Sequence, residues 1–271
     1  MRILVTGGTG VLGSQVVERL REAGHTAIVL SRRASTEADW VQGDIATGEG
    51  LEGALEGVDA VVHAASAAAE FRKIKSTDIQ GTTHLVAAAE KAGVKHLVYI
   101  SIVGIDMVPY VYYKAKVAAE ETVKAGGVPW TILRATQFPE LIDRVLRASR
   151  GPFLFVPGSM SFQPVHSSEV AQRLAELSLS SPAGMLADFG GPEVLTTKEI
   201  AHAWMARRGL SKIVVGVPIP GKAGRSFRAG NHLSPEHRDG HGTWAGWVAR
   251  AYAGGAIPTA YGRRREASRD S

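Results

Sequence analysis

A glycine-rich segment near the start of the chain limits the possible folds more than any other feature. It runs Thr6-Gly7-Gly8-Thr9-Gly10-Val11-Leu12-Gly13 and follows a short apolar run at residues 3–6. The G-x-G-x-x-G spacing allows a tight turn, close approach of the backbone to a pyrophosphate, and close packing of a helix on a strand. Amide groups at the start of that helix would face the anion. The segment predicts a phosphate-binding loop for a dinucleotide, formed by Gly7, Gly8, Thr9, Gly10, Val11, Leu12 and Gly13.

Short apolar runs then alternate with longer helical patterns as far as about residue 135. The runs predict strands at residues 3–6, 27–31, 59–63, 97–101 and 130–133, with a weaker one at 40–43. Helical spacing covers residues 13–23, 76–92 and 113–125. This alternation predicts an α/β protein with a Rossmann-type, doubly wound parallel sheet in a core of residues 1–135.

The second half has a different rhythm. It predicts helices at residues 139–149, 168–179, 197–209 and 243–252, and strands at 153–156 and 213–217. We expect residues 136–255 to form a smaller substrate-binding lobe that is interleaved with the edge of the core. Residues 218–242 are rich in Gly, Pro and His and predict a long loop. Residues 256–271 predict a basic, frayed tail.

Composition excludes several classes of function. The 271 residues contain no cysteine, which excludes thiolate metal sites and thiol nucleophiles and fits a reducing compartment. The net charge is +5, but the last nine residues supply +2 of it through four arginines and two acidic residues. The apolar run at the N-terminus predicts a strand rather than a signal peptide, and no stretch reaches the roughly 18 apolar residues of a membrane span. We expect a cytoplasmic protein without nucleic-acid or membrane partners.

The end of the second predicted strand bears on the choice of dinucleotide. NAD-preferring enzymes place an acidic residue there for the ribose 2′-hydroxyl, whereas arginine accommodates a 2′-phosphate. This chain has Ser31-Arg32-Arg33 and no acid, which predicts NADP(H) rather than NAD(H). The alternative is a solvated pair of loop arginines. Gly43 and Asp44 end the next strand, where Asp44 would contact adenine or serve as a cap.

Several segments spread over the first 200 residues support a more specific interpretation. They are the glycine-rich loop, Gly43-Asp44, His63-Ala64-Ala65, and residues 97–101, 112–120, 130–138, 163–171 and 191–196. Together they resemble the extended and atypical short-chain dehydrogenase/reductases, and within these the NmrA-like, NAD(P)H-binding branch. The resemblance covers about residues 1–210. It implies a Rossmann core, a small C-terminal lobe that holds substrate, and NADP(H). Members include reductases, quinone reductases and regulators that bind the dinucleotide without turning it over.

The resemblance also implies a catalytic tyrosine and lysine in a Y-x-x-x-K spacing, which puts both side chains on one helix face. Two such pairs overlap, Tyr110 with Lys114 and Tyr112 with Lys116. In the family's mechanism the tyrosine gives a proton to the substrate oxygen. The lysine lowers the pKa of that tyrosine and contacts the nicotinamide ribose. Pro109 favours the second pair, because it places Tyr110 in the loop before the helix.

The family's mechanism adds a hydroxyl group at the end of the fifth strand. Ser101 is the candidate, but the usual serine or threonine falls at or beyond the next position, where this chain has Ile102 and Val103. Neighbours in a strand face opposite ways. Ser101 thus departs from the family's register. An alternative is that the protein reduces activated acceptors by positioning them for hydride transfer, without a Ser-Tyr-Lys triad.

The remaining candidates concern the cofactor and the substrate. His63, Ala64 and Ala65 end the fourth predicted strand, and we expect them close to the cofactor. Gln137, Phe138 and Met160 predict a cavity lining suited to a flat or aromatic molecule, or core packing in the case of Phe138 and Met160. The histidines at 232, 237 and 241 do not predict a metal site, because neighbouring proline and glycine residues favour a loop.

These features predict an NADP(H)-dependent oxidoreductase that acts on a small carbonyl, quinone or activated alkene, as a monomer or homodimer. Two alternatives remain open. One is a non-catalytic NAD(P)(H)-binding redox sensor or regulator that meets a protein partner. The other is a non-redox isomerase or epimerase of the same fold.

Overall fold

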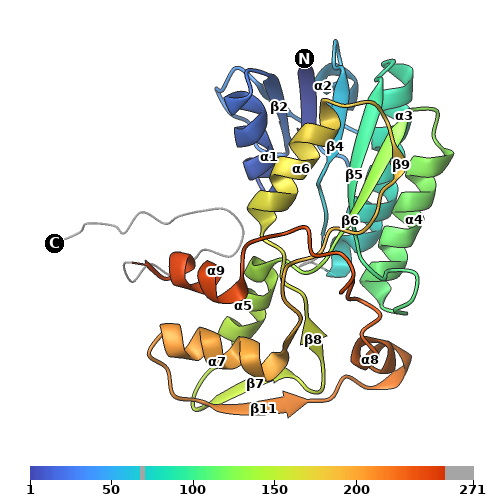
Figure 1. Ribbon diagram of the computed structural model, residues 1–271. Helices are drawn as coiled ribbons and strands as arrows, with labels where there is room; N and C mark the ends of the chain where they lie inside the picture. Colours follow the sequence, from blue (N-terminus) through green and yellow to red (C-terminus); the bar gives the residue numbers. More distant parts are fainter. Residues whose placement is uncertain (68–70, 254–271) are drawn as a thin grey trace.

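A parallel sheet forms the centre of the larger lobe. The computed structural model describes residues 1–67 and 71–253. The sheet has seven strands in the order β3-β2-β1-β4-β5-β6-β9, all parallel (Figure 1). The strands are β1 Arg2–Thr6, β2 Thr26–Ser31, β3 Trp40–Gln42, β4 Ala60–His63, β5 His96–Ile102, β6 Trp130–Ala135 and β9 Gly184–Met185. The predicted doubly wound sheet is confirmed.

Helices cover both faces of this sheet (Figure 1). On one face lie α1 (Val11–Glu22) and α6 (Ser167–Ser178), and on the other α3 (Gly81–Lys91) and α4 (Val111–Ala125). Because both faces are covered, the strands are apolar at successive positions, and Ile3, Leu4 and Val5 of β1 are all fully buried. Shorter elements join the layers: α2 (Leu51–Ala54), a 3-10 turn (Phe71–Lys73) and a π-helical turn (Lys75–Gln80).

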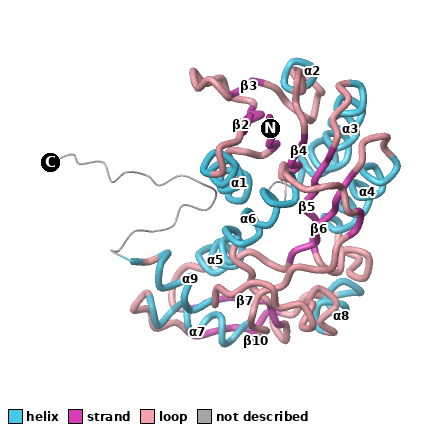
Figure 2. Tube along the Cα trace, turned by 45° about the horizontal axis from the view of Figure 1, so that its top comes forward, coloured by secondary structure: helices cyan, strands magenta, loops and turns pink. Residues whose placement is uncertain are grey.

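A smaller lobe lies at the carboxyl ends of the strands (Figure 2). Its helices are α5 (Pro139–Ala148), α7 (Thr197–Arg207), α8 (Gly221–Arg228) and α9 (Trp244–Ala251). Strands β7 (Phe153–Pro157) and β11 (Ile213–Val217) pair in parallel, and β8 (Ser161–Phe162) and β10 (Leu195–Thr196) pair antiparallel. Trp204 and Trp244 are almost completely buried at its centre.

The second half is interleaved with the larger lobe, since α6 packs against α1 and β9 pairs with β6. One expectation for this half is corrected. The predicted long loop at 218–242 contains the helix α8, which buries Gly224 and Ser226 despite its polar composition. The predicted basic tail at 256–271 lies outside the described residues.

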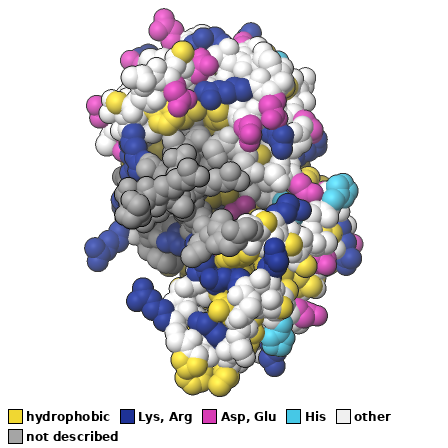
Figure 3. All heavy atoms as spheres, turned by 90° about the vertical axis from the view of Figure 1, so that its left-hand side faces the viewer, with side chains coloured by type: hydrophobic (Ala, Val, Ile, Leu, Met, Phe, Trp, Pro, Cys, Tyr) yellow, Lys and Arg dark blue, Asp and Glu magenta, His cyan; other side chains and the backbone are white. Residues whose placement is uncertain are grey.

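The surface carries mixed features. Figure 3 shows basic and acidic side chains intermixed on the upper part of one face, and hydrophobic side chains gathered at the lower end of the view. Exposed apolar residues of β7 and β11 include Phe153, Phe155 and Ile213. Within the described ranges, no helix has both the length and the apolar character that a membrane crossing requires.

Candidate active site

The glycine-rich loop joins β1 to α1 with the geometry that a phosphate group requires. Gly7 has a φ of +70°, and a Cβ on it would lie 2.8 Å from the backbone of Ala64. A Cβ at Gly13 would collide with the Gly7 carbonyl group. Gly10 has more space, with only the Gly7 carbonyl oxygen at 3.2 Å from its Cβ position. No side chain caps α1, and its first turn carries no acidic residue. The loop therefore fits a pyrophosphate at the helix N-terminus.

A cleft of about 1730 Å³ begins at this loop and is lined by residues of both lobes. It is larger than the roughly 300–1,000 Å³ of a site for one small ligand, so it has room for a dinucleotide and a substrate. Most of the predicted cofactor-binding residues line it: Gly7, Gly8, Thr9, Gly10, Val11, Leu12, Gly13, Ser31, Arg32, Arg33, Gly43, Asp44, Ala64 and Ala65. The residues predicted from the sequence to bind the dinucleotide therefore lie together at one end of the cleft.

Arg32 and Arg33 are exposed at the rim of this cleft. Their backbone is fixed, since the Trp40 indole donates to the Arg33 carbonyl oxygen at 2.6 Å and the Arg33 amide donates to the Ser31 hydroxyl at 3.2 Å. In the described part of the chain neither guanidinium forms an ion pair. Asp44 accepts from the Ala46 amide at 2.8 Å, so its carboxylate stabilises a turn.

His63 lies beneath the cleft and not in it. Its ring is fully buried, with Nδ1 2.7 Å from the Thr6 hydroxyl and Nε2 2.9 Å from the Thr82 hydroxyl. Burial lowers the pKa of His63 to about 3, so the ring is neutral. The expectation that this side chain lies beside the cofactor is corrected, because its hydrogen bonds hold β1 and α3 together behind the phosphate loop.

A chain of hydrogen bonds links Tyr112 to a buried carboxylate. The phenol oxygen lies 2.6 Å from the Ser66 hydroxyl, which donates to Asp78 Oδ1 at 2.7 Å. Since Ser66 gives its only hydrogen to Asp78, the phenol must be the donor in the first bond. The Ala67 amide donates to Asp78 Oδ2 at 3.0 Å, and Asp78 is 1% exposed. Sequence reasoning missed Ser66 and Asp78, although Ser66 directly follows the predicted His63-Ala64-Ala65 segment.

Lys116 lies one helical turn after Tyr112 and lines the same cleft. It is 2% exposed, donates to the Ile100 carbonyl oxygen at 2.8 Å, and lies 4.1 Å from the centre of the Tyr99 ring. Burial lowers the pKa of Lys116 to about 8, although the carboxylates of Asp78 and Glu120 act in the other direction. Because Lys116 is buried, it does not form an exposed ion pair with Glu120, which is the alternative role for this lysine.

The overlapping pair is placed differently. Tyr110 is the residue before α4, and Lys114 is exposed and outside the cleft lining. Tyr112 and Lys116 are therefore the Y-x-x-x-K pair that the structure brings together.

Ser101 lies on the face of β5 that carries Tyr99, beside Glu120. Glu120 forms a bidentate ion pair with Arg134, at 2.9 and 2.8 Å. Burial acts to raise the pKa of Glu120, but the Arg134 guanidinium lowers it below its usual value. Ser101 lines the cleft but is 2% exposed. Its hydroxyl is buried and has no hydrogen-bond partner among the described residues, whereas the Ser66 hydroxyl contacts the phenol of Tyr112.

The predicted substrate residues also line the cleft. Phe138 and Met160 contribute apolar surface, and both also pack within the protein. The amide of Gln137 is occupied, since it donates to the His232 carbonyl oxygen at 2.8 Å and accepts from the Gln163 amide at 3.0 Å. Gln137 thus fixes the loop that follows α8.

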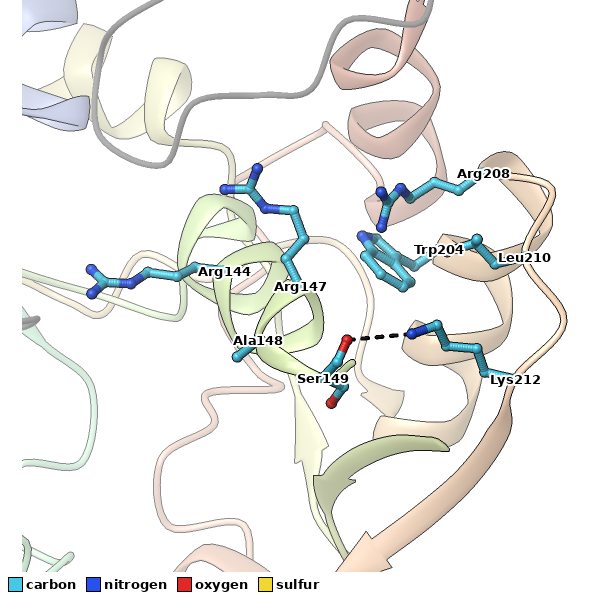
Figure 4. A pocket seen from close by; sticks show the side chains of 8 residues that line it. All are labelled: Arg144, Arg147, Ala148, Ser149, Trp204, Arg208, Leu210 and Lys212. Atoms are coloured by element: carbon cyan, nitrogen blue, oxygen red, sulfur yellow. Dashed lines mark hydrogen bonds between the residues drawn. The ribbon is translucent and has the colours of Figure 1, made fainter. Parts of the chain in front are cut away.

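No second candidate reaction centre is present among the described residues, either as a metal-binding group or in a further pocket. The described residues include no group of three His, Cys, Asp or Glu that could hold a metal ion. The second pocket, about 530 Å³, lies between α5 and α7 in the small lobe (Figure 4). Its cations make internal contacts: Arg147 pairs with Asp143 at 3.0 Å, and Arg208 lies 4.3 Å from the Trp204 ring.

The fold and site together define a dinucleotide-binding protein of the short-chain dehydrogenase/reductase type. Residues 7–162 match the family described as NAD(P)H-binding, and the chain belongs to this family. The resemblance seen in the sequence is confirmed.

Three known proteins illustrate what this chain is similar to. Photosystem II assembly factor Ycf39 of Synechocystis is 36% identical over 147 residues, which cover 51% of this chain and 45% of that protein. A (4-alkanoyl-5-oxo-2,5-dihydrofuran-3-yl)methyl phosphate reductase of Streptomyces griseus is 31% identical over 73% of this chain and 70% of its own. The NADPH-dependent quinone oxidoreductase QOR2 of Escherichia coli, solved with NADPH, has a TM-score of 0.73 at 18% identity over 92% of this chain and 99% of that one. The chain therefore spans less than half the length of Ycf39.

Proposed function

We propose that this protein is an NADPH-dependent reductase that transfers hydride to a small carbonyl, quinone or activated alkene. One observation carries the proposal: Tyr112 and Lys116 line the same cleft as the phosphate loop, from one face of α4. The reductase of Streptomyces griseus, which aligns over most of both chains, supports the same class of reaction.

The residues present fit the cofactor. The loop at Gly7–Gly13 would hold the pyrophosphate, Arg32 and Arg33 the 2′-phosphate, and Lys116 the nicotinamide ribose. When bound, the dinucleotide supplies the hydride. The Lys116 ammonium, held by the Ile100 carbonyl group, adds positive charge at the ribose end of the site.

Tyr112 gives the phenol proton to the oxygen of the substrate as hydride reaches the carbon. The phenol first exchanges its hydrogen bond to Ser66 for one to the substrate. The resulting phenolate is then stabilised by Ser66, whose hydroxyl turns from Asp78 toward it. A proton from solvent restores the phenol. Ser66 acts through Tyr112 and is a positioning residue in this scheme.

A dinucleotide-binding regulator is the second candidate. One observation favours it: about half of the chain, 51%, is similar to a photosystem II assembly factor. In a regulator the cleft would bind the dinucleotide, and the signal would pass to a protein partner.

Consumption of NADPH distinguishes the two candidates. Purified protein is given NADPH and a panel of aldehydes, ketones and quinones, and the absorbance of NADPH is followed. We expect oxidation with at least one acceptor and slower oxidation with NADH. Tight NADPH binding without oxidation by any acceptor would favour the regulator, and its affinity for protein partners would be compared with NADPH and with NADP⁺.

A further inference from the structure

An aromatic wall, formed by Tyr110, Tyr113, Phe162, Phe227 and His232, lines the end of the cleft at the small lobe. Phe227 is its centre, with ring centres 5.9 Å from Tyr113 and 5.0 Å from His232. The ring centres of Phe162 and His232 are 6.1 Å apart, and those of Tyr113 and Tyr112 are 6.4 Å apart. A continuous row of rings therefore leads from the proposed proton donor to His232.

The hydrogen bond of His232 determines which nitrogen of its ring carries the hydrogen. Nε2 lies 2.8 Å from the Ser161 carbonyl oxygen, which can only accept, so Nε2 carries the hydrogen. Nδ1 of the neutral ring is therefore an acceptor. This nitrogen is buried and has no hydrogen-bond partner among the described residues. Burial lowers the pKa of His232, which keeps the ring neutral and the acceptor available.

The backbone around His232 is held by hydrogen bonds, and a molecule in the cleft reaches Nδ1 only when the side chains that cover this nitrogen move aside. Its carbonyl oxygen accepts from Gln137, and the Ser234 amide donates to Gln163 Oε1 at 2.8 Å. The loop after β5 packs tightly against this segment, because a Cβ at Gly104 would collide with Asn231. His232 itself is 1% exposed.

An acceptor left unpaired in an apolar surrounding is costly, so this nitrogen gains from a hydrogen-bond donor that a ligand supplies. We propose that His232 Nδ1 accepts a hydrogen bond from the substrate, and that the substrate is a flat or aromatic carbonyl compound bearing a hydroxyl or N–H group. This inference rests on the proposed function, since it assigns the substrate end of the same cleft. Molecules that offer only carbonyl oxygens, such as unsubstituted quinones, would leave Nδ1 unpaired.

The test compares 4-hydroxyacetophenone with 4-methylacetophenone, because the methyl group matches the hydroxyl in size but cannot donate. Binding of each to the protein–NADP⁺ complex is measured by calorimetry, which requires no turnover. We expect the hydroxyl compound to bind about 10-fold more tightly, the effect of one buried hydrogen bond. Equal affinities, a preference for the methyl compound, or no binding of either would overturn the proposal.

The variant His232→Gln isolates the acceptor. The glutamine amide can still donate to the Ser161 carbonyl oxygen, but it places no acceptor at the position of Nδ1. We expect it to lose the preference while binding 4-methylacetophenone as the wild type does. His237→Gln, in the same loop but outside the cleft lining, should keep the preference. If His232→Gln fails to fold, equal affinities of the two ketones for the wild type still overturn the proposal.

The outcome separates this inference from the proposed function. A preference for the hydroxyl compound that disappears in His232→Gln supports the subsite, even if neither ketone is reduced and the reductase proposal fails. A preference that persists in folded His232→Gln overturns the subsite, even if NADPH is oxidised.

Discussion

The hydroxyl oxygen of Ser66 lies 2.6 Å from the phenol oxygen of Tyr112, and Ser66 is in turn bonded to the buried Asp78. The phenol of Tyr112, the candidate proton donor, therefore contacts Ser66, which lies just after β4, and not Ser101 at the end of β5. Ser101 also lines the cleft, and its hydroxyl has no hydrogen-bond partner among the described residues, so the first prediction compares the two serines.

Ser66→Ala should lower kcat with little change in KM or in NADPH affinity, because the hydroxyl acts on the phenolate and not on the bound substrate. A hydrogen bond to a charged group corresponds to a loss of about 10- to 100-fold. Steady-state kinetics measure this split, and Ser66→Thr should restore much of the rate. Ser101→Ala is the matched control and should have the smaller effect on kcat. The opposite order would return the catalytic role to Ser101.

Tyr112→Phe should lower the rate by about 100- to 10,000-fold, which is the usual contribution of a general acid. NADPH affinity should be unchanged, since the phenol acts where charge develops on the substrate oxygen. Tyr110→Phe is the control, because Tyr110 precedes α4 and its partner at the matching spacing, Lys114, is outside the cleft lining. Greater damage from Tyr110→Phe would mean that the other overlapping pair is used.

Lys116 should give the stability of the protein a characteristic pH dependence. Its pKa is lowered to about 8 in the folded state from 10.5 when unperturbed, so burial of the charged form destabilises the fold. The cost, about 3 kcal/mol, is fully present below pH 8 and disappears as the pH rises toward 10.5. Lys116→Met should therefore be more stable than wild type at pH 7, by a margin that shrinks by pH 9.5.

Urea unfolding of both proteins at the two pH values measures this margin. Lys114→Met is the control, since Lys114 is exposed, and its difference from wild type should not change with pH. A constant difference for Lys116→Met would show that this lysine is not held at a lowered pKa.

Replacement of Arg32 and Arg33 by alanine should weaken NADPH binding about 10- to 100-fold, because charge-assisted contacts to the 2′-phosphate are lost. NADH binding should be nearly unchanged. A double variant of Arg19 and Arg173, two half-buried helix arginines paired with glutamates, removes the same charge elsewhere. Calorimetric titration at one salt concentration compares all three proteins. Equal losses for both dinucleotides would remove the assignment of a 2′-phosphate site.

The first half of the fold was predictable because its signals are local. The glycine-rich loop, the buried strands and the helix ends follow from spacing over a few residues, and Tyr112 and Lys116 share a helix. His63 shows the limit: its position at a strand end was predicted, but the direction of its ring depends on hydroxyl partners in β1 and α3.

Long-range contacts explain what the sequence did not indicate. Ser66 and Asp78 meet Tyr112 only in the folded chain. Helix α8 lies in a segment whose glycine content favours a loop, and Phe227 within it packs on Tyr110 and Tyr113. The role of His232 depends in the same way on Ser161 and Gln137, which are distant in sequence.

The central claim is that the cleft carries out hydride transfer from NADPH. It is tested most directly with NADPH that carries deuterium at C4 of the nicotinamide in one configuration at a time. The product of an active acceptor is analysed by mass spectrometry. The account predicts that one of the two labelled forms, and only one, transfers its deuterium to the product carbon. Product that lacks deuterium with both forms, or NADPH that binds and is never oxidised, would contradict it.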